Sequence, residues 1–349
     1  MTSIAVKYEV TIALPVYNVE RYIRLSMESI LAQTFDDIEF LVCDDCGTDH
    51  SIDIVHEYQQ NHPRGKDIRI VRQPYNMGVG AGRNLIISEA RGRYIYFMDP
   101  DDEIVPETIS LLHEQAVKYD ADMVYGSYEQ IMLLDDNTTV HRFQYPAKTF
   151  LKENEFANYA FSRYDLIQAN TWNFLIKVEV YRKNGIHYKH INFWEDFTTT
   201  IDLPTYATRV VLMPDITYKY YCRTGSLSNF QQRKHISKTE IQKTVDAMNL
   251  VKLNSERIKN KPYFPQRMYK VMMTHFYMVC SILKKEGTIT PAFTKREMRD
   301  MMRSPLTLGE TISLKGWRLK NLALYLLGVL PPALTVAAIR YVGKKKGLV

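Results

Sequence analysis

Apolar and polar residues alternate in blocks along the first third of the chain. Short apolar runs, rich in β-branched and aromatic residues, predict strands, and the segments between them place apolar residues three or four positions apart, which predicts amphipathic helices. We expect strands over residues 10–14, 38–43, 68–71 and 94–98, and helices over residues 20–31, 82–90 and 106–119, with a further helix beginning near Asp49 or Ser51. Strands separated by helices favour right-handed crossovers, so this pattern predicts a mostly parallel α/β sheet of the nucleotide-binding kind, with helices on both faces.

The pattern changes further along the chain. Residues 123–125 predict one more strand, and a hairpin that follows has its expected turn at residues 135–137. From residue 231 onward the spacing of apolar residues is helical. We therefore expect an α/β domain over residues 1–230 and a helical region over residues 231–349.

The net charge of +6 conceals a division between these two parts. Residues 231–349 carry a net charge of +16, and the first 230 residues carry −10. An acidic half suits a cation and a basic half suits an anionic surface, unless the Lys and Arg residues only occupy the solvent faces of helices. Composition is that of a folded globular protein, and we expect no nucleic-acid partner.

The cysteines and the N-terminal residues bear on location. The four cysteines are too few and too scattered for a disulfide framework, and the C-x-x-C spacing of Cys43 and Cys46 lacks the second ligand pair that zinc needs. The N-terminal residues have no basic start followed by an apolar stretch, so they do not predict a signal peptide. We expect reduced thiols and a cytoplasmic location.

The C-terminal tail, residues 315–349, combines apolar and basic segments. Residues 321–342 are nearly free of charge, but Pro331 and Pro332 divide them into two halves, each too short to span a bilayer as a helix. The basic residues Lys315, Arg318, Lys320 and Lys344–Lys346 flank this stretch. The tail therefore predicts peripheral association with the anionic inner face of the cell membrane. The alternative is a helical hairpin that closes the domain.

An acidic cluster ends the apolar run at residues 94–98. Asp99, Asp101 and Asp102 follow this expected strand directly, at the sheet edge where open α/β sheets place their ligands. Carboxylates packed this closely repel one another unless a hard divalent cation or an equivalent positive charge shares them. The cluster indicates a Mg²⁺ or Mn²⁺ site, and the alternative is an acidic turn or the N-cap of the helix after Pro106.

Four further stretches carry a family resemblance together with this cluster. They are residues 10–18 (VTIALPVYN), 39–49 (EFLVCDDCGTD), 76–84 (NMGVGAGRN) and 194–196 (WED). In this order and spacing the five motifs resemble the family 2 glycosyltransferases, which have the GT-A fold. The resemblance covers roughly residues 8–230.

The first two stretches are candidates for binding the nucleotide. Pro15 fixes the chain at the end of a strand, where Tyr17 can offer a flat apolar face to a nucleobase. Asp45 can accept a hydrogen bond from a base ring N–H, and the resemblance assigns that base to uracil or a relative, which implies a UDP-sugar. We expect Asp44 and Asp45 to divide their roles, one capping the turn and the other binding.

The third stretch adds Asn76 and Arg83 to the nucleotide-sugar site. Its three glycines permit close approach of the backbone, and Arg83 supplies a forked charge suited to a phosphate or a carboxylate. The glycine spacing matches neither a dinucleotide fingerprint nor a P-loop. Downstream, residues 220–228 resemble the family segment that closes over the diphosphate, with Arg223 and Ser226 as donors.

The acidic residues receive their roles from the resemblance. It makes Asp101 the direct metal ligand and places Asp99 near the ribose or the metal shell, with Asp102 as support. The cation would neutralise the diphosphate leaving group. It also makes Asp196 the base that takes the acceptor proton, with Glu195 as its neighbour in the acceptor pocket. The alternative for this pair is a helix N-cap with a surface Glu.

Two residues depart from the family pattern. Cys46 stands where the family usually has glycine, and Phe174 replaces a common lysine, which puts a basic contact to the sugar or acceptor in doubt.

The resemblance implies a metal-dependent, inverting hexosyltransferase. It would move a sugar from a nucleotide diphosphate donor to a hydroxyl of a glycan or lipid-linked glycan, in the assembly of cell-surface polysaccharide. A sugar nucleotidyltransferase is the alternative, but it needs a glycine-rich basic loop after the first strand, which residues 14–18 lack. A catalytically silent protein that binds nucleotide sugars is the third possibility.

Overall fold

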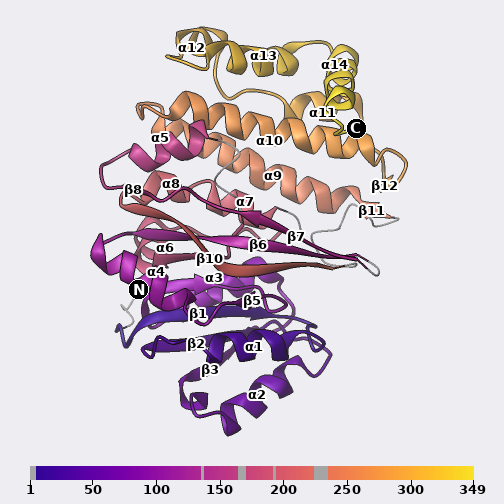
Figure 1. Ribbon diagram of the computed structural model, residues 1–349. Helices are drawn as coiled ribbons and strands as arrows, with labels where there is room; N and C mark the ends of the chain where they lie inside the picture. The colour runs from indigo at the N-terminus through magenta and orange to yellow at the C-terminus, as the bar shows by residue number, and fades with distance from the viewer. Residues whose placement is uncertain (1–4, 135–136, 164–169, 192–193, 224–234) are drawn as a thin grey trace. The chain divides into compact units, whose positions relative to one another are not determined.

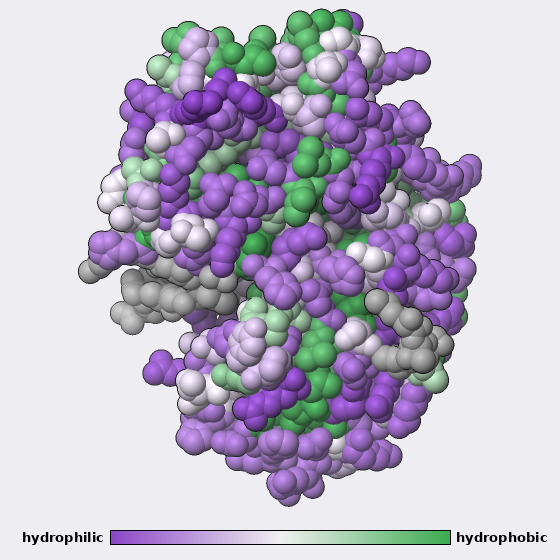
Figure 2. All heavy atoms as spheres, turned by 180° about the vertical axis from the view of Figure 1, so that it is seen from behind, coloured by the Kyte–Doolittle hydropathy of each residue, from purple (hydrophilic) through white to green (hydrophobic). Residues whose placement is uncertain are grey.

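The computed structural model describes residues 5–134, 137–163, 170–191, 194–223 and 235–349 (Figure 1). The chain divides into two compact units. The α/β unit consists of Met1–Phe156, Gln168–His190 and Glu195–Ser226, and the helical unit consists of Ala157–Ile167, Ile191–Trp194 and Leu227–Val349. Most of the surface visible in Figure 2 is hydrophilic, as the composition suggests.

One ten-stranded sheet forms the centre of the α/β unit. Its strands are β1 (Tyr8–Val16), β2 (Ile38–Asp44), β3 (Ile68–Arg72), β4 (Gly92–Phe97), β5 (Glu103–Ile104), β6 (Met123–Leu134), β7 (Asn137–Phe143), β8 (Lys148–Phe150), β9 (Phe174–Lys177) and β10 (Val210–Arg223). The order is β3-β2-β1-β4-β9-β6-β10-β5, with β7 paired to β6 and β8 to β10. Strands β3, β2, β1 and β4 are parallel, and so are β6 and β10, whereas β9 is antiparallel to both of its neighbours.

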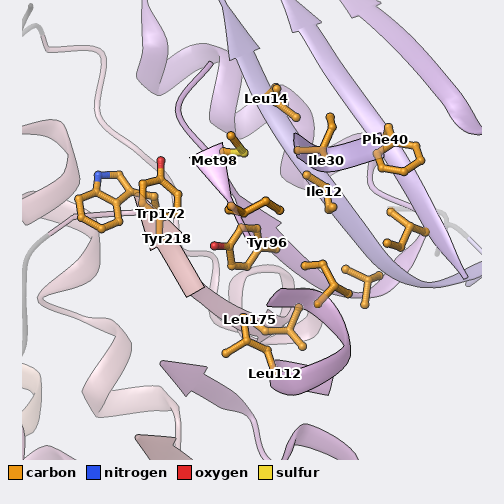
Figure 3. Close-up of a cluster of buried hydrophobic side chains, with 14 of the residues drawn as sticks. Ile12, Leu14, Ile30, Phe40, Tyr96, Met98, Leu112, Trp172, Leu175 and Tyr218 are labelled. Atoms are coloured by element: carbon orange, nitrogen blue, oxygen red, sulfur yellow. The ribbon is translucent and has the colours of Figure 1, made fainter. Parts of the chain in front are cut away.

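Helices cover both faces of this sheet, which confirms the expected fold class. The helices of the α/β unit are α1 (Ile23–Leu31), α2 (Ser51–Asn61), α3 (Val79–Glu89), α4 (Thr108–Lys118), α6 (Val178–Asn184), α7 (Glu195–Thr200) and α8 (Leu203–Tyr206), with a 3₁₀ turn at Gly65–Asp67. Helix α5 (Glu155–Ser162) begins in this unit and continues into the helical unit. On one face, Ile12 and Phe40 from the strands pack with Ile30 of α1 (Figure 3). On the other face, α3 and α6 lie against the sheet, and the ring of Tyr181 on α6 contacts that of Phe97 on β4.

Two local details differ from the simple pattern. Helix α3 begins at Val79, three residues before the expected start, because Gly80 and Gly82 are helical here. Gly80 is required by close packing, since a Cβ at this position would lie 2.5 Å from the carbonyl oxygen of Lys189. The hairpin expected after residue 125 is formed by β6 and β7, whereas its expected turn residues 135 and 136 lie outside the described residues.

The helical unit has its own apolar core. Its elements are α9 (Lys238–Asn254), a 3₁₀ turn (Ser255–Ile258), α10 (Phe264–Lys284), α11 (Lys295–Met301), α12 (Leu308–Ser313), α13 (Arg318–Val329) and α14 (Pro332–Lys345), with β11 (Ile236–Ser237) paired to β12 (Ile289–Thr290). Met268 and Phe276 of α10 contribute to this core together with Leu324 of α13 and Ile339 of α14. Among the described residues, none of the helices has the length and apolar character needed to cross a membrane.

Candidate active site

The carboxyl ends of three parallel strands meet at one edge of the sheet. Val16 of β1 is paired with Asp44 of β2, and the Asp45 N–H donates to the Val16 carbonyl at 3.0 Å. The Met98 N–H, just past the end of β4, donates to the Ala13 carbonyl of β1 at 3.0 Å. This parallel register brings the predicted residues Pro15, Tyr17, Asp45, Asp99 and Asp101 to the same edge. Pro15 is buried, whereas the Tyr17 side chain is 43% exposed and free to stack on a flat ligand.

Asp45 holds the glycine-rich segment in place. Its two carboxylate oxygens accept the backbone N–H groups of Met77 and Gly78 at 2.8 and 2.9 Å. Burial raises the pKa of Asp45, and these two hydrogen bonds act against that increase. Asn76 is exposed beside it, and its Oδ1 accepts the Gly78 N–H at 3.1 Å. A base contact by Asp45 would therefore use lone pairs that the loop leaves free.

Asp44 forms the turn that follows β2. Its Oδ1 accepts the Cys46 N–H at 2.8 Å, and its Oδ2 pairs with Arg72 at 3.2 Å. Cys46 has a φ of +58°, in the left-handed region that favours glycine. This backbone explains why glycine suits the position. The Cys46 thiol donates to the Gln73 carbonyl at 3.1 Å.

Arg83 gathers three carboxylates from distant parts of the chain. Its side chain, on α3, is only 4% exposed. Nη1 donates to Glu195 Oε1 at 3.0 Å and also to Asp196 Oδ1, while Nη2 donates to Asp99 Oδ1 at 3.4 Å. The guanidinium lies 5.4 Å from the centre of the Tyr188 ring. We call Arg83, Asp99, Glu195 and Asp196 the Arg83 cluster.

Charge and burial shift the proton affinities in this cluster. Burial alone would lower the pKa of Arg83, but Asp196, Glu195 and Asp99 outweigh it and hold the pKa above its usual value. Burial and the neighbouring Asp196 raise the pKa of Glu195 to about 7, against the opposing effect of Arg83. Burial also raises the pKa of Asp99 to about 7, with Arg83 opposing. Two carboxyl groups beside one guanidinium thus have proton affinities near neutrality.

Asp196 is held through one oxygen. Its Oδ1 accepts both the Arg83 bond and a 2.7 Å hydrogen bond from Thr171 Oγ1. Within the described part of the chain Oδ2 accepts no hydrogen bond, and the side chain is 24% exposed. The pair Glu195 and Asp196 occupies the first turn of α7, and both side chains pair with Arg83. Trp194, directly before them, has a φ of +57°, a strained conformation for a bulky residue.

The acidic cluster is tied to β10. Asp102 is fully buried, and its carboxylate accepts the Tyr218 hydroxyl at 2.7 Å and the Tyr221 N–H at 2.8 Å. Asp101 pairs instead with Arg223 at the end of β10, whose Nη1 donates to the Asp101 carbonyl at 2.6 Å and to Oδ2 at 3.2 Å. Ser226 lies outside the described residues. Asp102 therefore anchors the turn, and Asp99 and Asp101 are left facing the sheet edge, with side chains 30% and 29% exposed.

Asp99 and Asp101 form the donor set available for a divalent cation. No group of three or more His, Cys, Asp or Glu side chains suited to a metal occurs among the residues that the structure describes. Magnesium and manganese commonly take one or two protein carboxylates and complete their shell with substrate phosphates and water. Two partly exposed carboxylates fit that mode of binding.

Three residues of the site, Thr171, Tyr188 and Tyr218, could not be identified from sequence motifs. Thr171 fixes Asp196 and Tyr188 flanks Arg83, yet a lone Thr or Tyr carries no signal that separates it from an ordinary packing residue. The Tyr218 hydroxyl donates to Asp102 and accepts the Asp99 N–H, but the sequence around Tyr218 predicts only a strand and no role in the site. Phe174, the departure from the family lysine, is a buried residue of β9 packed on Tyr125, so its side chain belongs to the core.

Comparisons with known proteins agree with this geometry. The family model described as "Glycosyl transferase family 2" matches residues 11–185, half of the chain. The UDP-Glc:alpha-D-GlcNAc-diphosphoundecaprenol beta-1,3-glucosyltransferase WfgD of Escherichia coli is 32% identical over 141 residues, which cover 40% of this chain and 53% of WfgD, about half of that relative's length.

Solved structures show the same fold at low sequence identity. S. aureus TarS 1–349 in complex with UDP-GlcNAc has a TM-score of 0.61 at 16% identity, covering 92% of this chain and 90% of TarS 1–349. The mannosyltransferase PcManGT of Pyrobaculum calidifontis, solved with GDP-Man and Mn²⁺, has a TM-score of 0.51 at 14% identity, covering 93% of this chain and 87% of PcManGT. Two proteins solved with nucleotide sugars thus share the fold, and the family match shows that this chain belongs to glycosyl transferase family 2.

Proposed function

We propose that this protein transfers a hexose from a nucleotide diphosphate sugar to a hydroxyl group of a glycan or lipid-linked glycan, with inversion at the anomeric carbon. The observation that carries the proposal is the Arg83 cluster. One buried guanidinium holds Asp99, on the side of the donor, beside Asp196, the candidate base on the side of the acceptor. Such an arrangement suits a reaction in which a donor and an acceptor must meet in a fixed geometry.

In the proposed reaction Asp196 acts as the general base. The acceptor oxygen forms a bond to the anomeric carbon while the bond from that carbon to the diphosphate oxygen breaks, and the electron pair leaves with the nucleoside diphosphate. The acceptor proton passes to Asp196, whose Oδ2 is the available oxygen while Arg83 and Thr171 hold Oδ1. Attack from the face opposite the leaving group inverts the anomeric centre. Glu195 borders the acceptor pocket.

The donor is proposed to be a UDP-sugar lying along the sheet edge. Tyr17, two residues after the buried Pro15, offers its exposed ring to the base, and Asp45 and Asn76 border the same end of the site. Arg223, with Ser226, is proposed to contact the diphosphate. UDP-GlcNAc in TarS supports this donor class, because TarS shares the fold over nearly the whole chain.

A divalent cation, Mn²⁺ or Mg²⁺, is proposed at Asp101 with Asp99 in its shell. When bound, the cation would supply Lewis-acid stabilisation of the leaving diphosphate. Arg223 would share the Asp101 carboxylate with it, since Nη1 lies 3.2 Å from Oδ2. The Mn²⁺ in PcManGT supports the proposal as an observation on a protein of the same fold.

The setting is proposed to be the cytoplasmic face of the cell membrane, in the assembly of cell-surface polysaccharide. WfgD, by its name, acts on a sugar diphosphoundecaprenol, which is a lipid-linked acceptor, and its similarity to this chain covers 40% of the chain. The apolar and basic tail of this chain is consistent with such an acceptor.

A donor screen followed by product analysis tests the proposal. The protein is incubated with a panel of nucleotide sugars and Mn²⁺, and release of nucleoside diphosphate is measured with and without a glycosyl diphospholipid acceptor. We expect one UDP-sugar to be consumed faster with acceptor and the proton NMR spectrum of the product to show the inverted anomer. A retained anomer would contradict the role given to Asp196, and release of a sugar 1-phosphate instead would indicate a different reaction class.

A further inference from the structure

The last two helices are packed into the helical unit by one face each. The buried residues of this face are Asn321, Leu324 and Gly328 on α13 and Thr335, Val336, Ile339 and Gly343 on α14. Asn321 Nδ2 donates to the Pro265 carbonyl at 2.9 Å, and a Cβ at Gly328 would lie 2.5 Å from the Met302 carbonyl oxygen. Close backbone contact therefore fixes α13 to the rest of the unit, and the tail forms the closing hairpin rather than a free extension.

The opposite faces of the same helices are also apolar. On α13 the outward positions include Leu319 (75% exposed), Leu326 (46%) and Val329 (54%). On α14 they include Leu334 (56%) and Tyr341 (61%). No charged residue occurs between positions 321 and 339. A surface helix ordinarily places charged and polar residues on its outer face, so these two helices lack the polar half of the usual pattern.

Helix α12 extends this apolar surface. Leu308 and Ile312 are one turn apart and 46% and 47% exposed. Helix α12 contacts α13 within the helical unit, and Figure 2 shows apolar residues gathered on the surface over α12, α13 and α14. We call the outward faces of these three helices the tail platform. Several neighbouring large apolar side chains exposed on one surface mark an interaction site.

Basic residues flank the tail platform. Lys315, Arg318 and Lys320 precede α13 or begin it, and Lys344–Lys346 end α14. The only acidic residue of positions 308–349 is Glu310, whose carboxylate pairs with Lys259 at 2.9 Å. The Lys320 ammonium lies 3.7 Å from the centre of the Trp317 ring, which combines an apolar body with a polar edge. An apolar centre with a basic margin is complementary to an anionic lipid surface.

We propose that the tail platform is a membrane-docking surface, which seats the protein on an anionic bilayer through its exposed apolar side chains while the flanking Lys and Arg contact lipid phosphates. Helices α13 and α14, with 12 and 14 residues, are too short to span a bilayer, and we expect their apolar faces to lie in its interfacial layer. The inference rests on the proposed membrane setting and names the surface responsible. Docking leaves the buried face in place, because Leu324, Val336 and Ile339 belong to the core. Deleting residues 315–349 would expose that core, so the test uses substitutions at exposed positions.

Vesicle sedimentation with matched variants tests the proposal. The full chain is mixed with vesicles of phosphatidylglycerol and phosphatidylcholine, and its partitioning is compared with that of Leu326→Glu/Leu334→Glu. Leu250→Glu/Leu253→Glu is the control, because both leucines lie on α9 of the same unit and are 49% and 57% exposed. We expect at least a tenfold loss of binding for the tail variant, none for the α9 variant, and unchanged thermal unfolding for both.

A charge series separates the basic margin from the apolar centre. Each Lys near an anionic surface contributes about a fivefold factor in partitioning, so Lys344→Gln/Lys345→Gln/Lys346→Gln is expected to bind about 100-fold more weakly and to depend less on salt. Equal binding of the tail and control variants, or no binding by the full chain, would overturn the proposal. A dimer that Leu326→Glu/Leu334→Glu converts to a monomer would instead make the platform an interface between copies. Donor consumption measured without vesicles reports on the glycosyltransferase proposal separately.

Discussion

Replacement of Arg83 is the sharpest perturbation that the site offers. Arg83 is the one cation that contacts Asp99, Glu195 and Asp196 in the described structure, and its side chain is almost fully buried. Arg83→Lys keeps the charge but loses the planar fork that reaches separate carboxylates. Since a displacement of about 1 Å at a reacting group can cost about 100-fold in rate, we expect transfer by this variant to fall by about two orders of magnitude.

Arg83→Met removes the charge and should also affect stability. Breaking a buried ion pair from one side costs about 3–5 kcal/mol, and the side chains of the three carboxylates are between 15% and 30% exposed, so we expect a loss of about 3 kcal/mol. The loss should grow with pH. Burial raises the pKa of Glu195 to about 7, above its ordinary 4.5, so its contribution to stability is present at low pH and is lost as pH rises through the folded pKa. Without Arg83 that pKa rises further, and the deficit should widen between pH 6 and pH 8.5.

Arg69→Lys is the matched control for these measurements. Arg69 pairs with Glu39 at 2.9 Å and Glu89 at 3.0 Å, so it also bridges two carboxylates within the α/β unit, but outside the Arg83 cluster. Transfer rates come from released nucleoside diphosphate, and stability comes from urea unfolding at several pH values. We expect Arg69→Lys to keep its transfer rate. Near-normal transfer by Arg83→Lys, or a deficit of Arg83→Met that does not depend on pH, would refute the reasoning.

Three further predictions concern separate features. Asp101→Asn should weaken Mn²⁺ binding measured by EPR in the presence of UDP by at least tenfold, and unchanged binding would remove Asp101 from the metal site. Tyr17→Ala should raise the Kd for UDP about tenfold by calorimetry without changing urea unfolding, because the ring is exposed; an unchanged Kd would count against stacking. Burial lowers the pKa of Lys252 to about 7, below the 10.5 of free lysine, so the unfolded chain binds the proton more strongly and wild-type stability should rise between pH 7 and 10 by up to about 4 kcal/mol. Lys252→Met should abolish that rise, and a variant that retains it would show that another group titrates.

Much of the fold could be predicted because periodicity reports on burial. The strands at residues 10–14 and 94–98 and the helix at 106–119 all lie within a few residues of the observed β1, β4 and α4. Helix α3 began earlier than expected because Gly80 and Gly82 look like loop residues, whereas the close approach of Lys189 requires a glycine in the helix. Short strands such as β9, with four residues, have too few positions to show a period.

The site could be predicted only in part. Residues at strand ends, such as Asp45 and Asp99, follow from the topology, because parallel strands end at the same edge. Their partners do not: Arg83 and Asp196 are 113 positions apart, and Thr171 reaches Asp196 across 25 positions. The packing of the tail could not be predicted either, because in an apolar helix hydropathy does not distinguish the face that packs on the protein from the face exposed to solvent.

Asp196→Asn tests the central claim most directly. The substitution keeps the shape of the side chain and removes the carboxylate that would take the acceptor proton, and general-base catalysis contributes about 100- to 10,000-fold. The two measurements are the rate of sugar transfer under saturating donor and the Kd for the UDP-sugar by calorimetry. We predict that the rate falls by about 1,000-fold while the Kd changes less than threefold. Transfer at a near-normal rate, with donor binding intact, would contradict Asp196 as the base and with it the proposed mechanism.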